Sequence, residues 1–209
     1  MDVKIALIGA GKVGQGFLAN LRKRREQLAS RYGISFQLVS ICDLAGGSII
    51  SPSGLKIGEI LPILENNGSL VEYEPAGQVC VKGLDVNACI ETSHADVVVE
   101  SIVFNRETGE PALSYIRRAL SQRKHVVTCN KGPVSLHYKE LTALAKANGV
   151  RFLFGGTMMN GTPVINIISN SFRADDVQEI RGVLNVSANY ILWAMEQGLT
   201  FEEGVKEAR

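Results

Sequence analysis

The first fourteen residues constrain the fold of this chain most strongly. A short apolar run, VKIALI over residues 3–8, leads directly into the sequence GAGKVG over residues 9–14. A run this short, bounded by Asp2 and by a glycine, is typical of a buried strand rather than a helix. Apolar residues then recur at helical spacing over residues 17–28. The segment therefore predicts a strand, a glycine turn and an amphipathic helix, in that order.

Each glycine of this G-x-G-x-x-G pattern has a separate role when a strand precedes it and a helix follows. Gly9 permits the tight turn, Gly11 lets the backbone approach a pyrophosphate, and Gly14 lets the helix pack close to the sheet. The helix N-terminus offers free N–H groups and the positive end of its dipole to the phosphates. We interpret the pattern as a dinucleotide-binding site. The alternative is a glycine turn that serves packing alone.

Strand and helix patterns alternate from residue 3 to residue 154. Later strands are expected at residues 35–42, 97–100, 124–128 and 150–154. Helices are expected at residues 12–30, 85–93, 112–121 and 136–147, the first of them stopped at Gly33. A loop is expected over residues 44–53, and an exit turn over residues 130–133. The alternation predicts an α/β fold with a Rossmann-type doubly wound parallel sheet.

The pattern changes after residue 154, where a loop is expected over residues 155–163. An apolar helical stripe follows, which we interpret as core or dimer contact; it consists of Val164, Ile165, Ile168 and Phe172. A strand is then predicted over residues 177–184 and a helix over residues 188–197. We therefore divide the chain into a dinucleotide-binding (Rossmann) domain, residues 1–154, and the start of an α+β substrate-binding and dimerisation region, residues 155–209.

The last predicted helix begins close to the end of the sequence. Thr200 and Glu203 form a capping box, which starts a helix. Barely two turns remain between this signal and residue 209. We expect either a natural end there or a chain that is a fragment of a longer protein.

Charge and cysteine content exclude several classes of function. The 209 residues carry a net charge of +1, which gives no electrostatic argument for binding nucleic acid or a membrane surface. A basic cluster at residues 22–25 is interpreted as a solvated helix face. The four cysteines have no C-x-x-C spacing and fit reduced thiols in a cytoplasmic protein. No apolar run approaches the ~20 residues of a membrane span.

Several residues suited to ligand binding fall at the carboxyl ends of predicted strands, where ligands bind in a doubly wound sheet. They are Gly9, Asp43, Ser101 and Lys131. Asp43 closes the second strand, where a carboxylate holds the adenosine ribose hydroxyls and repels the 2′-phosphate of NADP. Because no arginine follows Asp43 directly, the sequence favours NAD over NADP.

Lys131 is the candidate catalytic residue. In hydride transfer between a nicotinamide and a carbonyl, the protein must move a proton to or from the reacting oxygen. A lysine whose pKa is lowered by burial or by neighbouring positive charge can do so, and Lys131 follows a strand that is expected to be buried. The alternative is a surface lysine in a turn. Glu100 is a second candidate, or a carboxylate that caps a neighbouring N–H. The three histidines have no metal-ligand spacing, so no metal site is predicted.

Several longer motifs together resemble one known family. IALIGAGKVGQGF, VVVES followed by TGEPA, HVVTCNKGP, GGTMMNGTPVI and RGVLNVSANYIL are similar to segments of homoserine dehydrogenase, in that family's order and over nearly the whole chain. The resemblance implies NAD(P)-dependent interconversion of L-homoserine, the small-molecule substrate, and L-aspartate 4-semialdehyde. It also implies a homodimer and a role in threonine and methionine biosynthesis.

The resemblance also assigns residues by motif. The cofactor would be held by Gly9, Gly11, Lys12, Val13, Gly14, Asp43, Ser101 and Asn130, with Ser101 near the nicotinamide half. Lys131 matches one of the family's catalytic lysines. The loop beside the substrate would be formed by Asn185, Ser187 and Asn189.

The sequence departs from the family in three places. Gly155 and Gly156 replace a Glu-Ala pair whose glutamate helps bind a monovalent cation, and Val186 replaces a glycine beside the substrate. The family's later Gly-Tyr-Ala-Glu segment and the Asp and Lys motif after it, which carry substrate-binding acids and a second catalytic lysine, do not occur here. Two alternatives to homoserine dehydrogenation therefore stay open: a relative that binds a dinucleotide without turnover, and a dehydrogenase of a related amino or semialdehyde substrate.

Overall fold

The computed structural model describes residues 1–66, 68–75, 79–159 and 162–208. The chain divides into two compact units, Met1–Phe154 and Gly155–Arg209, and each is described by itself. Two residues of the expected loop over 155–163, Asn160 and Gly161, lie outside the described residues, as does Arg209.

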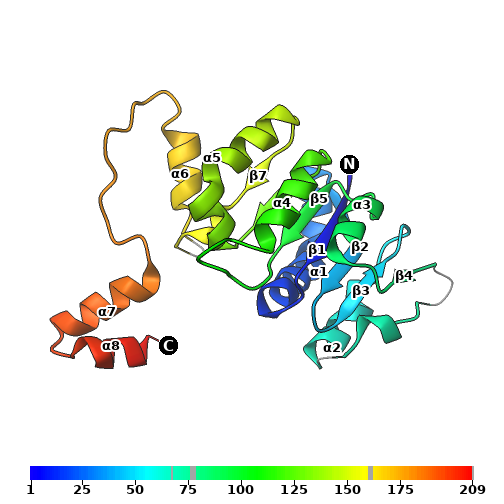
Figure 1. Cartoon of the computed structure of the whole chain (residues 1–209), viewed down its shortest axis with the longest axis horizontal. Helices are drawn as coiled ribbons and strands as arrows, with labels where there is room; N and C mark the ends of the chain where they lie inside the picture. The colour runs from blue at the N-terminus through cyan, green and yellow to red at the C-terminus, as the bar shows by residue number, and fades with distance from the viewer. Residues whose placement is uncertain (67, 76–78, 160–161, 209) are drawn as a thin grey trace. The chain divides into compact units, whose positions relative to one another are not determined.

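The first unit is built on a seven-stranded sheet with the order β4-β3-β2-β1-β5-β6-β7 (Figure 1). The strands are β1 Asp2–Ile8, β2 Ser35–Asp43, β3 Gly47–Ile50, β4 Val81–Lys82, β5 Val97–Glu100, β6 His125–Thr128 and β7 Phe152–Leu153. The helices of this unit are α1 Lys12–Tyr32, α2 Ile57–Glu65, α3 Val86–Thr92, α4 Ala112–Ser121 and α5 Lys131–Ala147, with a 3₁₀ turn η1 at Leu70–Glu72. The predicted α/β class is confirmed.

The central strand β1 shows why this order forms. Leu7 pairs with Ile41 of β2 on one side and with Val99 of β5 on the other, and all five strands from β2 through β1 to β7 run parallel. The chain leaves β1 toward β2 and later returns on the other side as β5. The carboxyl end of β1 is therefore the point where the strand order reverses, and ligands bind at such a point.

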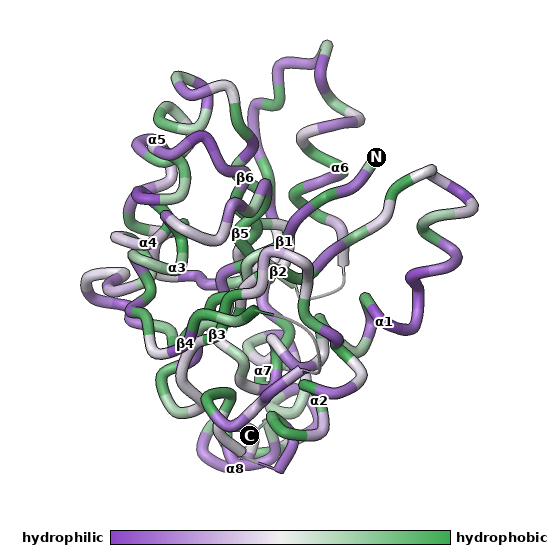
Figure 2. Tube along the Cα trace, turned by 90° about the vertical axis from the view of Figure 1, so that its right-hand side faces the viewer, coloured by the Kyte–Doolittle hydropathy of each residue, from purple (hydrophilic) through white to green (hydrophobic). Residues whose placement is uncertain are grey.

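Helices cover both faces of the sheet, because alternate residues of β1 point to opposite sides. Ile5 and Leu7 pack with α1 and α2, whereas Ala6 and Ile8 pack with α3, α4 and α5. Strand β5 carries three consecutive valines, at residues 97–99, before it ends on Glu100, as expected for a strand covered on both faces (labelled β5 in Figure 2). Helix α1 ends as predicted at Gly33, whose φ of 65° is left-handed and whose N–H bonds the Ala29 carbonyl.

The predicted loop over residues 44–53 was wrong at residues 47–50, and the predicted parallel sheet carries two strands with antiparallel pairing at one edge. Residues Gly47–Ile50 form β3, which pairs antiparallel with β2, and β4 pairs antiparallel with β3. The turn forms because the Asp43 carboxylate accepts hydrogen bonds from the Ala45 and Gly46 N–H groups, at 3.0 and 2.9 Å. Ile49 and Ile50 of this strand are buried in the core. The glycines and serines around them are typical of a loop, which is why the sequence did not indicate a strand here.

The predicted exit turn over residues 130–133 is instead the start of α5. Asn130 is the N-cap, and its side-chain oxygen accepts a hydrogen bond from the Gly132 N–H. Non-helical backbone at His137 (φ −130°) marks the junction of two helical segments, close to residue 136, where the helix was predicted to begin. Lys131 is consequently the first helical residue and not part of a free turn.

The second unit is helical in the residues that the structure describes. It contains a 3₁₀ turn η2 at Gly155–Thr157 and the helices α6 Val164–Ser171, α7 Val186–Glu196 and α8 Phe201–Glu207. The capping box of α8 is confirmed: Thr200 and Glu203 exchange side chain–backbone hydrogen bonds. The strand predicted over residues 177–184 is wrong, since these exposed residues form no strand in the described part of the unit.

The apolar stripe after residue 163 lies on and beside α6. Val164, Ile165 and Ile168 are half-buried, and Phe172, the residue after the helix, is exposed. Among the helices that the structure describes, none combines the length and the hydrophobicity that a membrane span requires.

Candidate functional site

The glycine loop after β1 is held in place by very close packing of its own backbone. Gly9 has φ +89° and donates its N–H to the Cys42 carbonyl at 2.8 Å. A Cβ on Gly9 would lie 2.8 Å from the Ser101 backbone, and a Cβ on Gly14 would lie 2.2 Å from the Gly9 carbonyl oxygen. Both distances are shorter than atoms can tolerate. Gly9 and Gly14 are therefore required by the packing of the loop itself.

Gly11 differs from the other two glycines of the pattern. A Cβ on Gly11 would meet no atom within 4 Å, and the φ of −68° is open to any residue. The N–H groups of Lys12 and Val13, in the first turn of α1, have no acceptor among the described residues. The open space over Gly11 and these free donors together form a cradle for an anion at the helix N-terminus.

Asp43 and Ser101 tie this loop to the neighbouring strands. The Asp43 carboxylate accepts a hydrogen bond from the Ala10 N–H at 2.8 Å. The Ser101 hydroxyl donates to the Gly9 carbonyl at 2.7 Å, and its backbone N–H donates to the Ile8 carbonyl at 2.8 Å. The structure thus brings together residues that are 33 and 92 positions apart in the sequence.

A cavity of about 250 Å³ opens beside the loop. Gly9, Gly11, Asp43 and Ser101 line its polar side. Its other walls are largely apolar and include Leu44, Ile102, Val103, Pro111 and Tyr115. A slot with apolar walls, a carboxylate at one edge and free N–H groups at a helix start matches the base, ribose and phosphates of a nucleotide.

A buried polar network lies at the ends of the next two strands. The Glu100 side chain, in a residue only 1% exposed, accepts hydrogen bonds from the Thr128 hydroxyl, from the Ile102 N–H at 2.9 Å and from the Asn130 side-chain amide at 3.2 Å. The Thr128 hydroxyl oxygen in turn accepts the Asn130 N–H at 2.9 Å. Glu100 therefore does cap a neighbouring N–H, as one of its two interpretations predicted, and it also fixes the residue that caps α5.

The ionisation of Glu100 should make the stability of the protein depend on pH. Burial raises the pKa of Glu100, while the hydrogen bonds from Thr128, Ile102 and Asn130 favour the carboxylate and oppose that rise. The folded protein thus holds the proton more tightly than the unfolded chain. The contribution of Glu100 to stability is largest below the usual value of 4.5 and is lost as the pH rises through the raised pKa.

Glu100→Gln removes this titration, so urea unfolding of both proteins from about pH 4 to about pH 8 isolates it. The free energy of unfolding of the parent, relative to the variant, should fall with rising pH, by about 1.4 kcal/mol for each unit by which the pKa is raised. A difference that stays constant across this range would contradict the raised pKa of Glu100.

Asn130 and Lys131 lie at the start of α5. Asn130 is buried, and besides Glu100 its amide reaches the carbonyls of Ile102 and Val103 at 3.5 Å. Lys131 is exposed, as are Lys12 and Val13 at the start of α1. Lys131 therefore directly follows the buried N-cap residue Asn130, and its side chain is exposed to solvent.

The residues expected beside the substrate lie on the second unit. Asn185 is the N-cap of α7, and its side-chain oxygen accepts a hydrogen bond from the Ala188 N–H at 2.8 Å. Ser187 and Asn189 occupy the first turn of the same helix and are exposed. Gly155, which stands where a cation-binding glutamate was expected, begins η2. In the described residues, no group of three acidic, His or Cys side chains is placed to hold a metal ion.

Thr128 belongs to the buried network around Glu100, but the sequence did not indicate it. A threonine at the end of a buried apolar strand fits any β pattern, so the residue alone does not point to a site. Only the pairing of β5 with β6, which sets Glu100 opposite Thr128, shows that the two side chains meet.

Comparison with protein families gives two matches, which together cover nearly the whole chain. Residues 9–155 match the model described as "Homoserine dehydrogenase, NAD binding domain", and residues 163–209 match the model described as "Homoserine dehydrogenase". The first match alone covers more than half of the chain.

Similar curated proteins and solved structures agree with these matches. The chain is 36% identical to an NAD(+)-dependent homoserine dehydrogenase of Pseudomonas canavaninivorans, over 100% of this chain and 58% of that protein. It is 37% identical to a homoserine dehydrogenase of Methanocaldococcus jannaschii, over 98% of this chain and 60% of that protein. A hyperthermophilic archaeal homoserine dehydrogenase mutant in complex with NADPH aligns with a TM-score of 0.81 at 26% identity, over 100% of this chain and 60% of that one.

Proposed function

Because the chain belongs to the homoserine dehydrogenase family, we propose that it acts in the NAD(P)-dependent interconversion of L-homoserine and L-aspartate 4-semialdehyde. The chain spans about three fifths of the length of the relatives named above. It supplies the dinucleotide-binding domain, residues 1–154, and part of a substrate-binding and dimerisation region, residues 155–209. This reaction places the protein in threonine and methionine biosynthesis.

The observation that carries the proposal is the contrast among the three glycines of the loop. Packing explains why Gly9 and Gly14 lack a side chain, but nothing in the described protein explains it at Gly11. Space at Gly11, beside free N–H groups and the Asp43 carboxylate, fits a bound pyrophosphate with its adenosine ribose. A loop that served packing alone would not need this opening.

We propose NAD as the preferred cofactor. Asp43 is held by three backbone N–H groups, those of Ala10, Ala45 and Gly46, so its carboxylate is fixed at the mouth of the cavity. A fixed carboxylate favours ribose hydroxyls and repels a 2′-phosphate. NADP remains the alternative, to be compared directly in the assay below.

In the proposed reaction the nicotinamide, when bound, supplies the hydride acceptor for alcohol oxidation. Gly9, Gly11, Lys12, Val13, Gly14 and Asp43 bind the dinucleotide, and Ser101 fixes the loop beside it. Asn130 orients the first turn of α5, and Lys131 takes the proton from the substrate hydroxyl. Asn185, Ser187 and Asn189 contact the substrate.

We further propose a homodimer and a cytoplasmic location. The dimer is what the resemblance of the motifs implies, and it is supported by exposed apolar side chains of the second unit that are suited to contact a partner, such as Ile167, Phe172 and Trp193. The location is supported by the four cysteines, Cys42, Cys80, Cys89 and Cys129, which are all free thiols.

The proposal is tested by homoserine-dependent reduction of NAD⁺ and of NADP⁺, followed by the near-ultraviolet absorbance of the reduced cofactor. We expect turnover with L-homoserine, faster with NAD⁺ than with NADP⁺ at equal concentration. Binding of NADH without any turnover of homoserine would contradict the proposed reaction.

A second candidate is dinucleotide binding without homoserine turnover, or turnover of a related amino or semialdehyde substrate. Val186 favours it, because this residue takes the place of a glycine in the expected substrate loop and is exposed at the first helical position of α7. A screen of amino alcohols and semialdehydes in the same assay separates these alternatives from the main proposal.

Gly11→Ala provides a test of the cofactor site itself. Since the new methyl group meets no protein atom, the free energy of unfolding should change by less than about 1 kcal/mol. The methyl group would occupy the space of the pyrophosphate, so the affinity for NADH should fall at least about tenfold, or ~1.4 kcal/mol. Fluorescence titration with NADH measures this change.

Gly16→Ala is the matched control for this variant. Gly16 lies on α1, is exposed, and likewise has open space where a methyl group would be added, yet it does not line the cavity. Its substitution should leave NADH affinity unchanged. If Gly11→Ala bound NADH as tightly as Gly16→Ala, the pyrophosphate would not lie over Gly11.

A further inference from the structure

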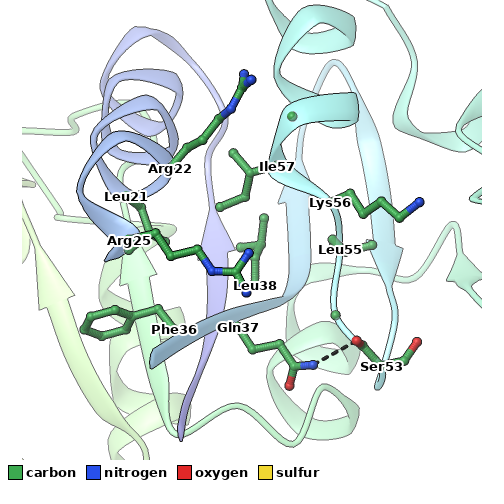
Figure 3. A pocket seen from close by; sticks show the side chains of 12 residues that line it. Leu21, Arg22, Arg25, Phe36, Gln37, Leu38, Ser53, Leu55, Lys56 and Ile57 are labelled. Carbon is green, nitrogen blue, oxygen red and sulfur yellow. Dashed lines mark hydrogen bonds between the residues drawn. The ribbon is translucent and has the colours of Figure 1, made fainter. Parts of the chain in front are cut away.

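A second cavity, of about 350 Å³, lies between α1, the start of β2 and the segment that leads into α2 (Figure 3). Leu21, Arg22 and Arg25 come from α1, and Phe36, Gln37 and Leu38 come from β2. Residues 53–58 close the remaining side, where the Gln37 side-chain amide donates a hydrogen bond to the Ser53 carbonyl at 2.8 Å. The cavity is thus formed by three separate segments.

This cavity is separate from the cofactor cavity. The two share no lining residue, and they lie at opposite ends of β2: Cys42 and Asp43 line the first, whereas Phe36 and Gln37 line the second. Cofactors and substrates bind at the carboxyl ends of the strands in such sheets. The proposed reaction therefore leaves the second cavity unexplained.

The charged side chains that line the second cavity are all positive, and only one of them has an acidic partner. Its charged lining residues are Arg22, Arg25 and Lys56. Lys56 is paired with Glu59 at 3.0 Å, but neither arginine forms an ion pair within the described parts of the chain. Three residues apart on a helix, the two arginines are neighbours whose like charges repel each other. Both arginines are exposed and free of ion pairs in the described structure, so their charges are available to a ligand.

One of the two guanidinium groups is placed against the start of α2. A Cβ on Gly58 would lie 3.5 Å from the Arg22 Cζ, so the guanidinium rests on the first turn of this helix. Helix α2 has no side-chain cap at Lys56, and the N–H groups of Ile57 and Gly58 lack acceptors in the described structure. These donors add to the positive character that the arginines establish.

The floor of the cavity is apolar. Leu38 and Leu55 are buried, and Leu21, Phe36 and Ile57 are half-buried around them. A ligand would therefore gain from a hydrocarbon or ring portion as well as from its charge. Arginine side chains bind carboxylate and phosphate oxygens in a bidentate manner.

From this combination we propose that the second cavity binds a small organic dianion, a phosphate monoester or a dicarboxylate with an apolar portion. Arg22 and Arg25 bind the anionic groups, and the floor of Leu21, Leu38 and Ile57 contacts the apolar portion. The other two members of the basic cluster, Lys23 and Arg24, do not line the cavity and remain a solvated helix face.

Isothermal titration calorimetry with phenyl phosphate and with phthalate tests the proposal, and phenol serves as the uncharged probe. The double variant Arg22→Gln, Arg25→Gln removes the two charges at the cavity. The matched control, Lys23→Gln with Arg24→Gln, removes two charges from the same helix away from it. Whichever of the two anionic probes binds more tightly shows whether the cavity prefers a phosphate monoester or a dicarboxylate.

We expect at least one of the dianions to bind, to bind at least tenfold more weakly to the cavity variant, and to bind the control variant as it binds the parent. Amide resonances of Ile57 and Gly58 in the parent should shift on addition of that probe, a readout that needs no variant. The proposal is overturned if neither dianion binds, if phenol binds equally well, or if both double variants lose affinity alike.

Discussion

Gly14→Ala is expected to lower both the stability of the protein and its affinity for a dinucleotide. The new Cβ would lie 2.2 Å from the Gly9 carbonyl oxygen, which is backbone and cannot rotate away. Either α1 or the loop must move, and overpacking of this kind costs about 1–3 kcal/mol or more. Movement of the loop would also break the hydrogen bond from the Ser101 hydroxyl to the same carbonyl.

The two effects are measured by urea unfolding and by NADH titration. We expect a loss of at least ~2 kcal/mol in the free energy of unfolding and at least ~100-fold weaker NADH binding, since ~2.7 kcal/mol corresponds to that factor. Gly16→Ala, on the exposed side of the same helix, is the control and should be neutral or slightly stabilising. A Gly14→Ala protein with parental stability would show that the loop does not pack as described.

Lys131→Ala is expected to reduce homoserine turnover by about 10²–10⁴-fold, the usual contribution of a proton-transferring group. Lys131 is exposed at the first position of α5, where alanine is compatible with the helix, so stability should change little. NADH affinity should be retained, because the glycine loop and Asp43 are unaffected. Steady-state rates and NADH titration together distinguish a loss of chemistry from a loss of binding.

Lys139→Ala is the matched control, since Lys139 is another exposed lysine of α5. It should leave the rate unchanged. A Lys131→Ala protein that turned over homoserine at the parental rate would remove Lys131 from the proposed chemistry. Equal losses in both variants would point to general electrostatic attraction of the substrate instead.

Features that depend on neighbouring residues could be predicted from the sequence. The β1–loop–α1 unit needs only a short apolar run, three glycines and an amphipathic helix, all within residues 3–32. The Gly33 stop and the capping box of Thr200 and Glu203 are equally local. All the residues that form such a start or stop signal lie within a few positions of one another, so they can be recognised in a single sequence.

Features that depend on distant partners could not be predicted in this way. Strand β3 begins with a glycine and a serine and becomes a strand because it pairs with β2 and buries Ile49 and Ile50. Residues 177–184 have strand-like composition, yet extended backbone becomes a sheet only beside a partner strand. The Glu100–Thr128 contact required the register of β5 and β6, which composition does not specify.

We have proposed that the glycine-loop cavity binds a dinucleotide for the oxidation of homoserine. The product that the protein forms from L-homoserine and NAD⁺ can be trapped as an aldehyde derivative and quantified beside NADH. We expect L-aspartate 4-semialdehyde and NADH in equal amounts. NADH-binding protein that forms no aldehyde from homoserine would contradict this claim.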